Sequence, residues 1–275
     1  MERRNLLTAG TAAGLLAAAM ATPAAAQGTA GSTAGGLSTL DRIQRNKKVA
    51  ITAEVDSPPF GILDSDGKPD GSEIATARQL AKDLGVELEF VQVNATQRIP
   101  ALLAGRVDIA ISSLSITTER AKVAAFCAPH GALSIVVCGP KSSAIANAAD
   151  MAGKRISLTR ATLEEATVPK VAPPDTKLVY FDDIGPTIQA LLSGQVDGAG
   201  MSAFAAKSVA DRNPTAGIEV KFTVTTAYYS AMVRQADESL RHWIDTWVFV
   251  NKNNGVLAGI YEKYTGVKLP PLPAI

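Results

Sequence analysis

The chain has 275 residues, 47% of them hydrophobic, and a mean hydropathy of +0.12. This length and composition suffice for one large or two medium domains with buried cores. Because 27 basic residues are balanced by 26 acidic ones, the charge gives no reason to expect nucleic acid or an anionic membrane as a partner.

The first 26 residues have the three parts of an export signal. An arginine pair near the start supplies positive charge, residues 6–20 form an apolar core, and Ala24–Ala26 form a small-residue cleavage site, which predicts cleavage after Ala26. Leucines after the arginine pair are also typical of a twin-arginine signal, so both export routes stay open. The apolar core is too short for a membrane anchor. Residues 27–36 are rich in Gly, Ser, Thr and Ala and are predicted to be a disordered leader.

From residue 37 to residue 104 the hydrophobic pattern alternates between helices and strands. It predicts a short helix through Leu40 and Ile43, a strand at 49–53, a helix at 73–84 that stops at Gly85, a strand at 86–93 and a helix at 94–104. Between the first strand and the second helix, Glu54-Val-Asp-Ser-Pro-Pro-Phe60 holds a proline pair. The prolines force an extended turn under which the phenylalanine can pack.

The stretch from Asp108 to Arg120 carries the strongest functional signal. Residues 109–111 are apolar and predict a buried strand. The strand breaks into a turn rich in serine, residues 112–115, which we call the serine turn. A helix follows, capped by Thr117 or Thr118, with Arg120 in its first turn. Free backbone N–H groups, hydroxyls and a guanidinium then meet at one point, a combination that suits a small carboxylate. An ordinary capped surface helix with a solvated arginine is the alternative interpretation.

Part of this stretch is repeated. The segment Ile99-Pro-Ala-Leu-Leu-Ala-Gly-Arg-Val-Asp-Ile-Ala-Ile111 recurs 89 residues later as Ile188-Gln-Ala-Leu-Leu-Ser-Gly-Gln-Val-Asp-Gly-Ala-Gly200. Each copy is predicted to be a helix, a glycine cap and a strand. Two such units predict two α/β lobes, with a ligand at the carboxyl ends of strands that face each other.

The rest of the chain continues the same pattern. It predicts strands at 133–137, 154–159 and 218–229, a helix that begins within 160–165, and a helical segment at 237–264 interrupted at 253–255. The cysteines, Cys127 and Cys138, are predicted to be buried, inert thiols. A disulfide stays open as an alternative, because the chain is predicted to be exported. Together with His130, their spacing fits no usual zinc pattern.

The segment Ser112-Ser-Leu-Ser-Ile-Thr-Thr-Glu-Arg120 closely resembles the ligand-carboxylate segment of the periplasmic amino-acid binding proteins of ABC importers, bacterial extracellular solute-binding protein family 3. Further matches run over most of residues 38–268. The resemblance implies a type II periplasmic-binding-protein fold, which is α/β with two lobes, a cleft between them and two crossover hinge strands. On this basis lobe 1 comprises residues 37–130 and 226–275, and lobe 2 residues 131–225.

The resemblance also implies a set of ligand-binding residues: Glu54, Ser57, Phe60, Ser113, Leu114, Ser115, Arg120, Arg160, Thr162, Leu163 and Ser202. Arg120 is expected to pair with the ligand carboxylate, and the hydroxyls of the set to add hydrogen bonds. Glu54 is expected to contact the other end of the ligand. Arg160 either adds a second positive contact or stays solvated at the rim.

Three positions depart from the family pattern. Ser57 stands where relatives usually have an aromatic residue, Ala161 replaces a glycine, and Ser202 replaces an aspartate that holds the ligand's α-ammonium. A hydroxyl provides no charge to pair with a buried ammonium. Either Glu54 supplies that charge, or the ligand has no ammonium.

The leading hypothesis is a periplasmic, monomeric receptor that closes on a small carboxylate-bearing solute, an amino acid or related organic acid, and delivers it to ABC permease subunits in the inner membrane. An enzyme on the same scaffold is the alternative, similar to the cyclohexadienyl dehydratases related to this family. Glu54, Glu164 or Glu165 would then be the general acid. A sensor that presents its ligand state to a membrane receptor is a third hypothesis.

Motifs for other chemistry are absent from the sequence. It has no Gly-x-Ser-x-Gly elbow, no P-loop and no zinc-ligand spacing. Gly198-Ala-Gly200 only mimics a dinucleotide fingerprint, because the equivalent strand of the first repeat copy leads into the serine turn. We therefore expect no cofactor and no metal.

Overall fold

The computed structural model describes residues 37–273, and the predicted signal and leader, 1–36, lie outside them. The helices are α1 (Thr39–Asn46), α2 (Ser72–Leu84), α3 (Arg98–Leu103), α4 (Thr118–Ala121), α5 (Leu163–Val171), α6 (Ile184–Leu192), α7 (Ala203–Arg212), α8 (Glu238–Asn253) and α9 (Val256–Thr265). The strands are β1 (Lys48–Ala53), β2 (Ile62–Leu63), β3 (Pro69–Asp70), β4 (Glu87–Gln92), β5 (Ala125–Phe126), β6 (Gly131–Pro140), β7 (Arg155–Thr159), β8 (Lys177–Phe181), β9 (Gly198–Ser202), β10 (Ile218–Tyr229) and β11 (Met232–Val233).

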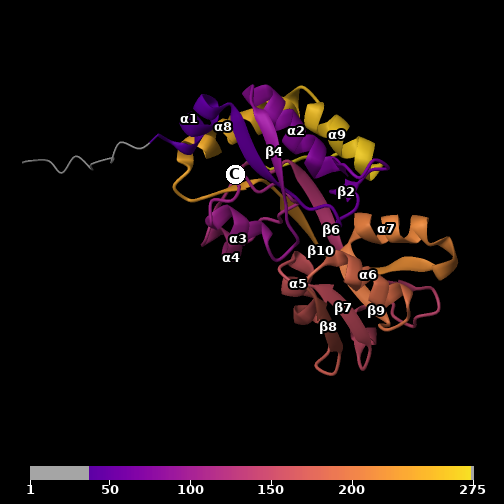
Figure 1. The fold of residues 1–275 in the computed structure, drawn as a ribbon. Coiled ribbons are helices and arrows are strands. Elements are labelled where there is room, and N and C mark those ends of the chain that lie inside the picture. The colour runs from indigo at the N-terminus through magenta and orange to yellow at the C-terminus, as the bar shows by residue number, and fades with distance from the viewer. Residues whose placement is uncertain (1–36, 274–275) are drawn as a thin grey trace, which may run out of the picture. The chain divides into compact units, whose positions relative to one another are not determined.

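The first lobe is built on β1 and β4, which pair in parallel with Lys48 opposite Glu87. Helices α1, α2, α8 and α9 pack around this pair (Figure 1). Their apolar faces meet the strands in one core, which includes Ile43 of α1, Ile51 of β1, Leu80 of α2 and Ile244 of α8, all fully buried. This packing orients β1 so that its carboxyl end delivers the segment that follows Ala53 to the cleft.

The second lobe is a five-stranded sheet in the order β10-β6-β9-β7-β8. Successive side chains of a strand face opposite sides: Val136 and Cys138 of β6 lie in one core, and Val137 between them lies in another. Leu191 of α6 joins the first core, as does α7, and Val168 of α5 joins the second. Helices therefore cover both faces of this sheet.

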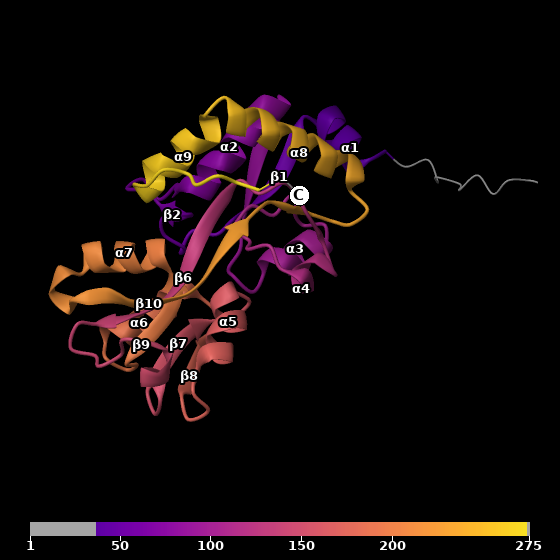
Figure 2. The ribbon, with the colours of Figure 1, turned by 180° about the vertical axis from the view of Figure 1, so that it is seen from behind.

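Strands β6 and β10 run from the first lobe into the sheet of the second (Figures 1 and 2). They pair antiparallel from Gly131 opposite Tyr229 to Pro140 opposite Ile218. They are the two crossovers of a two-lobe fold. The predicted lobe boundaries fall at the start of β6 and within β10, and they remain a proposal.

Two predicted elements differ from the structure. Residues 109–111 form isolated bridges, Ile109 with Ile51 and Ala110 with Met232, instead of a strand, because the chain turns at the serines before a ladder can extend. The helix predicted at 94–104 begins only at Arg98, because the Asn94 side chain accepts the backbone N–H of Gln97 and holds the preceding residues in a turn.

Glycines end the helix of each repeat copy, as predicted. Gly105 follows α3 with φ +71° and Gly194 follows α6 with φ +73°, a left-handed conformation that suits glycine.

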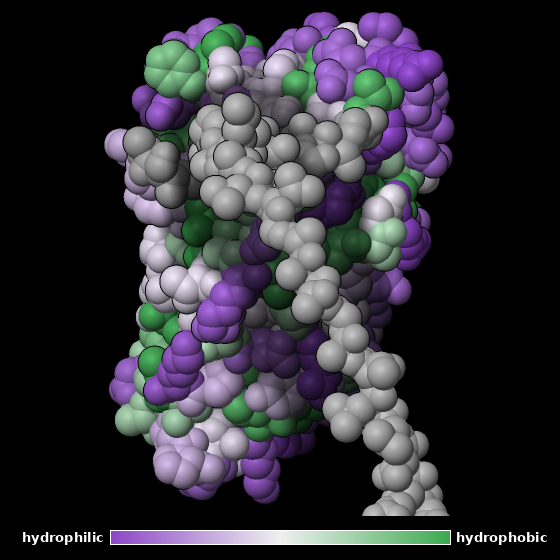
Figure 3. Space-filling view, turned by 90° about the vertical axis from the view of Figure 1, so that its left-hand side faces the viewer, coloured by the Kyte–Doolittle hydropathy of each residue, from purple (hydrophilic) through white to green (hydrophobic). Residues whose placement is uncertain are grey.

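On the face in Figure 3, hydrophobic residues gather near the middle, between more hydrophilic regions. Within residues 37–273, no helix is long and apolar enough to cross a membrane.

Candidate functional site

A cavity of about 40 Å³ lies between the two lobes. Both lobes contribute to its wall, which comprises Ser57, Phe60, Arg98, Ser113, Ser115, Arg120, Leu133, Ile135, Thr159, Thr162, Leu163, Glu164, Ile184, Thr187, Gly200, Met201, Ser202 and Ala205. A cavity of this size has room for about two or three water molecules. A larger ligand therefore requires the lobes to separate, or the arginine side chains to move.

The serine turn forms the first-lobe side of the wall. Thr52 of β1 anchors it, because its hydroxyl accepts the N–H of Ile111 at 2.9 Å and contacts the Ser112 hydroxyl at 2.9 Å. Ser113 has φ +46°, a left-handed conformation that a non-glycine residue adopts at a cost. Leu114 points into the core and is fully buried. The serines on either side of it, Ser113 and Ser115, consequently line the cavity.

Arg120 reaches the cavity from the short helix after this turn. Thr117 is the helix cap, because its hydroxyl accepts the N–H of Arg120 at 3.2 Å. The partly buried guanidinium donates to two backbone carbonyls, Ser115 O at 2.9 Å and Ala161 O at 2.8 Å. No carboxylate of residues 37–273 lies within ion-pair distance of it. Burial, and then the charge of Arg98, lower the Arg120 pKa to about 10.

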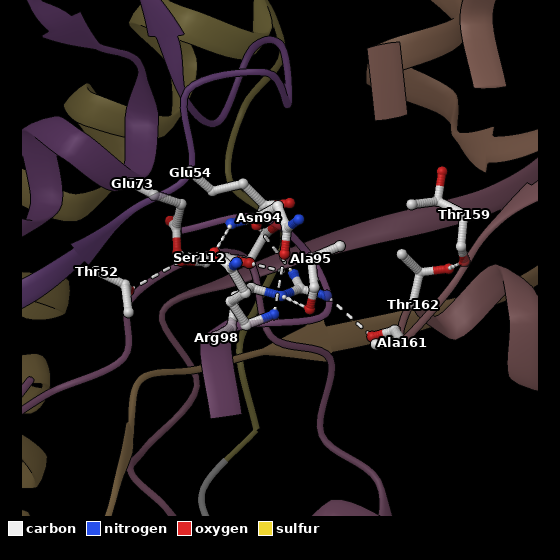
Figure 4. Close-up of polar contacts among 12 residues, drawn as sticks. Thr52, Glu54, Glu73, Asn94, Ala95, Arg98, Ser112, Thr159, Ala161 and Thr162 are labelled. Atoms are coloured by element: carbon white, nitrogen blue, oxygen red, sulfur yellow. Dashed lines mark hydrogen bonds and ion pairs between the residues drawn. The ribbon is translucent and has the colours of Figure 1, made fainter. Parts of the chain in front are cut away.

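Arg98 is a second cation on this wall, which sequence reasoning missed. Its side chain is 6% exposed. It donates to Ala95 O at 3.1 Å, to Ser112 O at 2.9 Å and, across the cleft, to Ala161 O at 3.0 Å (Figure 4). Its position relative to the repeat could have indicated it. Arg98 and Thr187 each stand one residue before a repeat copy, and both line the cavity.

Glu54 lies behind Arg98. The two side chains form an ion pair at 3.2 Å, with Glu54 3% exposed, but the geometry is not that of a hydrogen bond and both carboxylate oxygens lack a hydrogen-bond partner. Burial raises the pKa of Glu54 to about 7, although the charge of Arg98 acts in the opposite direction. Glu54 is therefore the counter-ion of Arg98 and lies outside the cavity wall.

The second-lobe side is the loop before α5. Ala161, at the usual glycine position, has φ +57°, which explains why glycine suits it. Its carbonyl accepts from both arginines. Thr162 caps α5, accepting the N–H of Glu165 at 3.3 Å. In the first turn of α5, Glu164 faces the cavity, and burial raises its pKa. A Cβ on Gly200 of β9 would lie 2.5 Å from the Leu158 side chain of β7 and 3.1 Å from Val168 of α5, so this glycine leaves room for both.

Ser202 ends β9 at the cavity wall, where its hydroxyl caps α7. The hydroxyl accepts the N–H of Ala205 at 3.1 Å. Ser202 and Ser113 stand 89 residues apart, at matched positions of the repeat, and both line the cavity. Because Ser202 is neutral and engaged in a cap, it offers no counter-charge to an ammonium.

One known protein family matches most of the chain. The family model described as "Bacterial extracellular solute-binding proteins, family 3" matches residues 49–267. The chain belongs to this family. The ABC transporter glutamine-binding protein GlnH of Bacillus subtilis (strain 168) is 27% identical over 233 residues, covering 82% of this chain and 84% of the relative. The ABC transporter arginine-binding protein 1 of Escherichia coli (strain K12) is 25% identical, covering 81% and 89%.

Solved structures agree with the family assignment. The solute receptor for L-cysteine of Neisseria gonorrhoeae matches this family-3 chain with a TM-score of 0.77 and 27% identity, covering 82% of this chain and 92% of the other. The ancestral amino acid-binding protein AncCDT-1, described as a precursor of cyclohexadienyl dehydratase, matches with a TM-score of 0.75 and 28% identity, covering 83% and 100%. These neighbours confirm the predicted two-lobe fold.

The predicted site residues fall into two groups in this family-3 protein. Eight line the cavity: Ser57, Phe60, Ser113, Ser115, Arg120, Thr162, Leu163 and Ser202. The structure places the other three elsewhere. Glu54 and Leu114 are buried behind the wall. Arg160 is exposed, stacks on Tyr180 at 4.9 Å and lies 3.5 Å from Asp182, which corresponds to the solvated alternative.

The two cysteines are free and fully buried. Burial raises the pKa of Cys138 to about 12 and that of Cys127 further, so neither is a reactive thiolate at neutral pH. Among the residues that the structure describes, no three His, Cys, Asp or Glu side chains form a potential metal site.

The raised pKa of Glu54 makes stability depend on pH. Its folded pKa of about 7 exceeds the ordinary value of 4.5, so its contribution is fully present below pH 4.5 and is lost as the pH rises through 7. We expect the unfolding free energy of the wild type to fall by roughly 2–3 kcal/mol relative to Glu54→Gln over this range. Urea unfolding of both proteins at pH 4.5, 6 and 7.5 measures the difference. If their unfolding free energies changed in parallel with pH, the raised pKa of Glu54 would be contradicted.

Proposed function

We propose that this protein is the periplasmic substrate-binding component of an ABC importer and binds a small carboxylate-bearing solute. The observation that carries the proposal is Arg120, a partly buried cation on the wall of the cavity between the lobes that has no carboxylate partner within residues 37–273. A desolvated cation without a counter-charge is unfavourable, so the site is suited to an anionic ligand.

The surrounding groups extend the same proposal. Ser113 and Ser115 from one lobe would donate hydrogen bonds to the carboxylate bound by Arg120. The Thr162 hydroxyl of the other lobe donates to Thr159 O at 2.6 Å in the structure and would have to turn away from it to join them. In the structure the Ala161 carbonyl accepts from Arg98 and Arg120. A ligand carboxylate would replace this carbonyl as the acceptor for Arg120. Binding would then close the lobes about β6 and β10, since the ligand contacts both sides.

The rest of the ligand would meet a different surface. Leu133, Ile135 and Met201 make this part of the wall apolar. With Glu54 engaged by Arg98 and Ser202 by a helix, Glu164 is the carboxyl group on the wall. It is the candidate partner for an α-ammonium if the solute is an amino acid. An organic acid without an ammonium would require no such partner.

The relatives support transport as the role of this binding. Those described above are named as binding proteins of ABC transporters for glutamine and for arginine. We propose that the protein is exported, cleaved after Ala26 and acts as a monomer that delivers its solute to permease subunits of the inner membrane. A role in sensing would use the same site and the same closure.

A second candidate function rests on Glu164. Burial raises the pKa of this carboxyl, which lies on the same wall as the proposed carboxylate anchor. A carboxyl group whose pKa is raised is better suited to general acid catalysis than an ordinary one. Because AncCDT-1 is described as a precursor of cyclohexadienyl dehydratase, dehydration of a cyclic carboxylate is the reaction to test.

A calorimetric screen of amino acids, keto acids and dicarboxylates tests the proposal. We expect one class to bind with one-to-one stoichiometry and without turnover. Prephenate and arogenate are assayed in parallel. Turnover by the wild type that is lost in Glu164→Gln would support the enzyme hypothesis and reject the receptor hypothesis. Failure of every carboxylate to bind would reject the proposed site.

A further inference from the structure

We propose that Glu73 and His130 are positioning residues, which hold the serine turn in its ligand-binding conformation without touching the ligand. This inference rests on the proposed function, since it concerns how the carboxylate site is assembled. Glu73 lies in the first turn of α2 and is 3% exposed, and His130 immediately precedes β6 and is 4% exposed. Neither residue lines the cavity.

The Glu73 carboxylate has two partners. It accepts the backbone N–H of Ser113 through Oε2 at 2.8 Å. The Nε2 atom of His130 lies 3.1 Å from each of its oxygens. Figure 4 shows Glu73 beside the serine turn, on the side away from Thr159 and Thr162. At these distances both partners contact the carboxylate directly.

The partner on the turn is the residue that needs support. Ser113 has φ +46°, and its side chain lines the cavity. A left-handed conformation costs a non-glycine residue about 1–2 kcal/mol, and such strain persists only where surrounding contacts determine it. A charge-assisted bond to the N–H of Ser113 is such a contact. Without it, the turn is free to relax and the hydroxyls to leave their positions.

His130 ties this carboxylate to the crossovers. Its backbone N–H donates to Tyr229 O at 3.1 Å, and its ring meets the Tyr229 ring edge-on, with centroids 5.1 Å apart. Tyr229 ends β10 opposite Gly131, the first residue of β6. The Glu73 carboxylate thus joins the serine turn to the point at which both crossover strands leave the first lobe.

Glu73→Gln is the first test of this role. A glutamine oxygen can still accept from Ser113, but the bond is no longer charge-assisted, and an NH₂ group replaces the second oxygen that faces His130 Nε2. We expect the affinity for the carboxylate ligand found in the screen to fall about fivefold to tenfold. Electrostatics alone predicts the opposite sign, because removing a negative charge near the site would favour an anion.

Ser113→Gly supplies the decisive comparison. Glycine adopts φ +46° without strain, so the affinity lost through Glu73→Gln should shrink to less than about twofold when it is measured in proteins that already carry Ser113→Gly. Ser115→Gly is the matched control. It removes the neighbouring hydroxyl, and Ser115 has no positive φ, so the full loss should persist in that background.

His130→Phe tests the second residue of the Glu73–His130 pair, and it provides an independent test if Glu73→Gln does not fold. Phenylalanine keeps a ring against Tyr229 and removes the hydrogen bond to Glu73, and Ser113→Gly should again reduce the loss. Unchanged affinity in both Glu73→Gln and His130→Phe, or an equal loss in the Ser113→Gly background, would overturn the inference while leaving the site intact. Binding that is indifferent to Arg120→Ala would instead overturn the proposed function.

Discussion

Replacing Arg120 by alanine is expected to weaken binding of the carboxylate ligand by about 100-fold or more. Arg98 is engaged by Glu54 and three carbonyls, whereas Arg120 donates only to two carbonyls and has free N–H groups for an anion. Truncating one partner of a desolvated charge pair costs about 2–5 kcal/mol, and each 1.4 kcal/mol is a factor of ten. Titration calorimetry of the folded variant measures the loss.

Arg160→Ala is the matched control for this prediction. Arg160 precedes the same second-lobe loop, but its side chain is exposed and lies over Tyr180. We expect its removal to change the affinity by less than about threefold, because exposed charges contribute roughly 0–1 kcal/mol. If Arg120→Ala retained most of the affinity, or Arg160→Ala lost as much, the carboxylate would bind elsewhere.

Replacing Arg98 by methionine is expected to destabilise the fold by about 3–5 kcal/mol at pH 7.5. The substitution leaves the Glu54 carboxyl buried without its cation, and removal of one partner of a buried pair costs this much. It also leaves the carbonyls of Ala95 and Ser112 without their donor. Urea unfolding monitored by circular dichroism gives the free energy.

Two comparisons make the Arg98 prediction specific. Arg106→Met replaces an exposed arginine just after α3 and should change the stability by less than about 0.5 kcal/mol. The double variant Arg98→Met, Glu54→Leu removes both buried charges and should recover most of the loss, because an apolar pair tolerates burial. A double variant no more stable than Arg98→Met would contradict the ion-pair explanation.

Much of the site was predictable because local chemistry determines it. Thr117 caps α4, Thr162 begins α5, and glycine ends the helix of each repeat copy. These features depend on contacts between residues a few positions apart, so the order of residues specifies them. The repeat, for the same reason, placed α3, α6 and β9 correctly along the chain, whereas the strand of its first copy is reduced to isolated bridges.

The errors came from competition between local patterns. Residues 109–111 are apolar enough for a strand, but the strained turn at Ser113 stops the ladder after isolated bridges. Residues 94–97 fit a helical pattern, yet the Asn94 side chain takes a backbone N–H that a helix would use. At Asn94 the side-chain acceptor prevails over the helix, because it satisfies a backbone N–H within the same turn.

The sequence by itself determined the family, the two-lobe α/β fold and eight of the residues that meet at the cavity, because repeats, caps and hydroxyl-rich turns are local or periodic. Only the tertiary structure decided how the charges are shared. Glu54 forms an ion pair with Arg98, and the Ser202 hydroxyl caps α7. Glu73 binds the serine turn and His130. Such pairings join residues that are distant in the chain, and they depend on which groups are buried together and deprived of water.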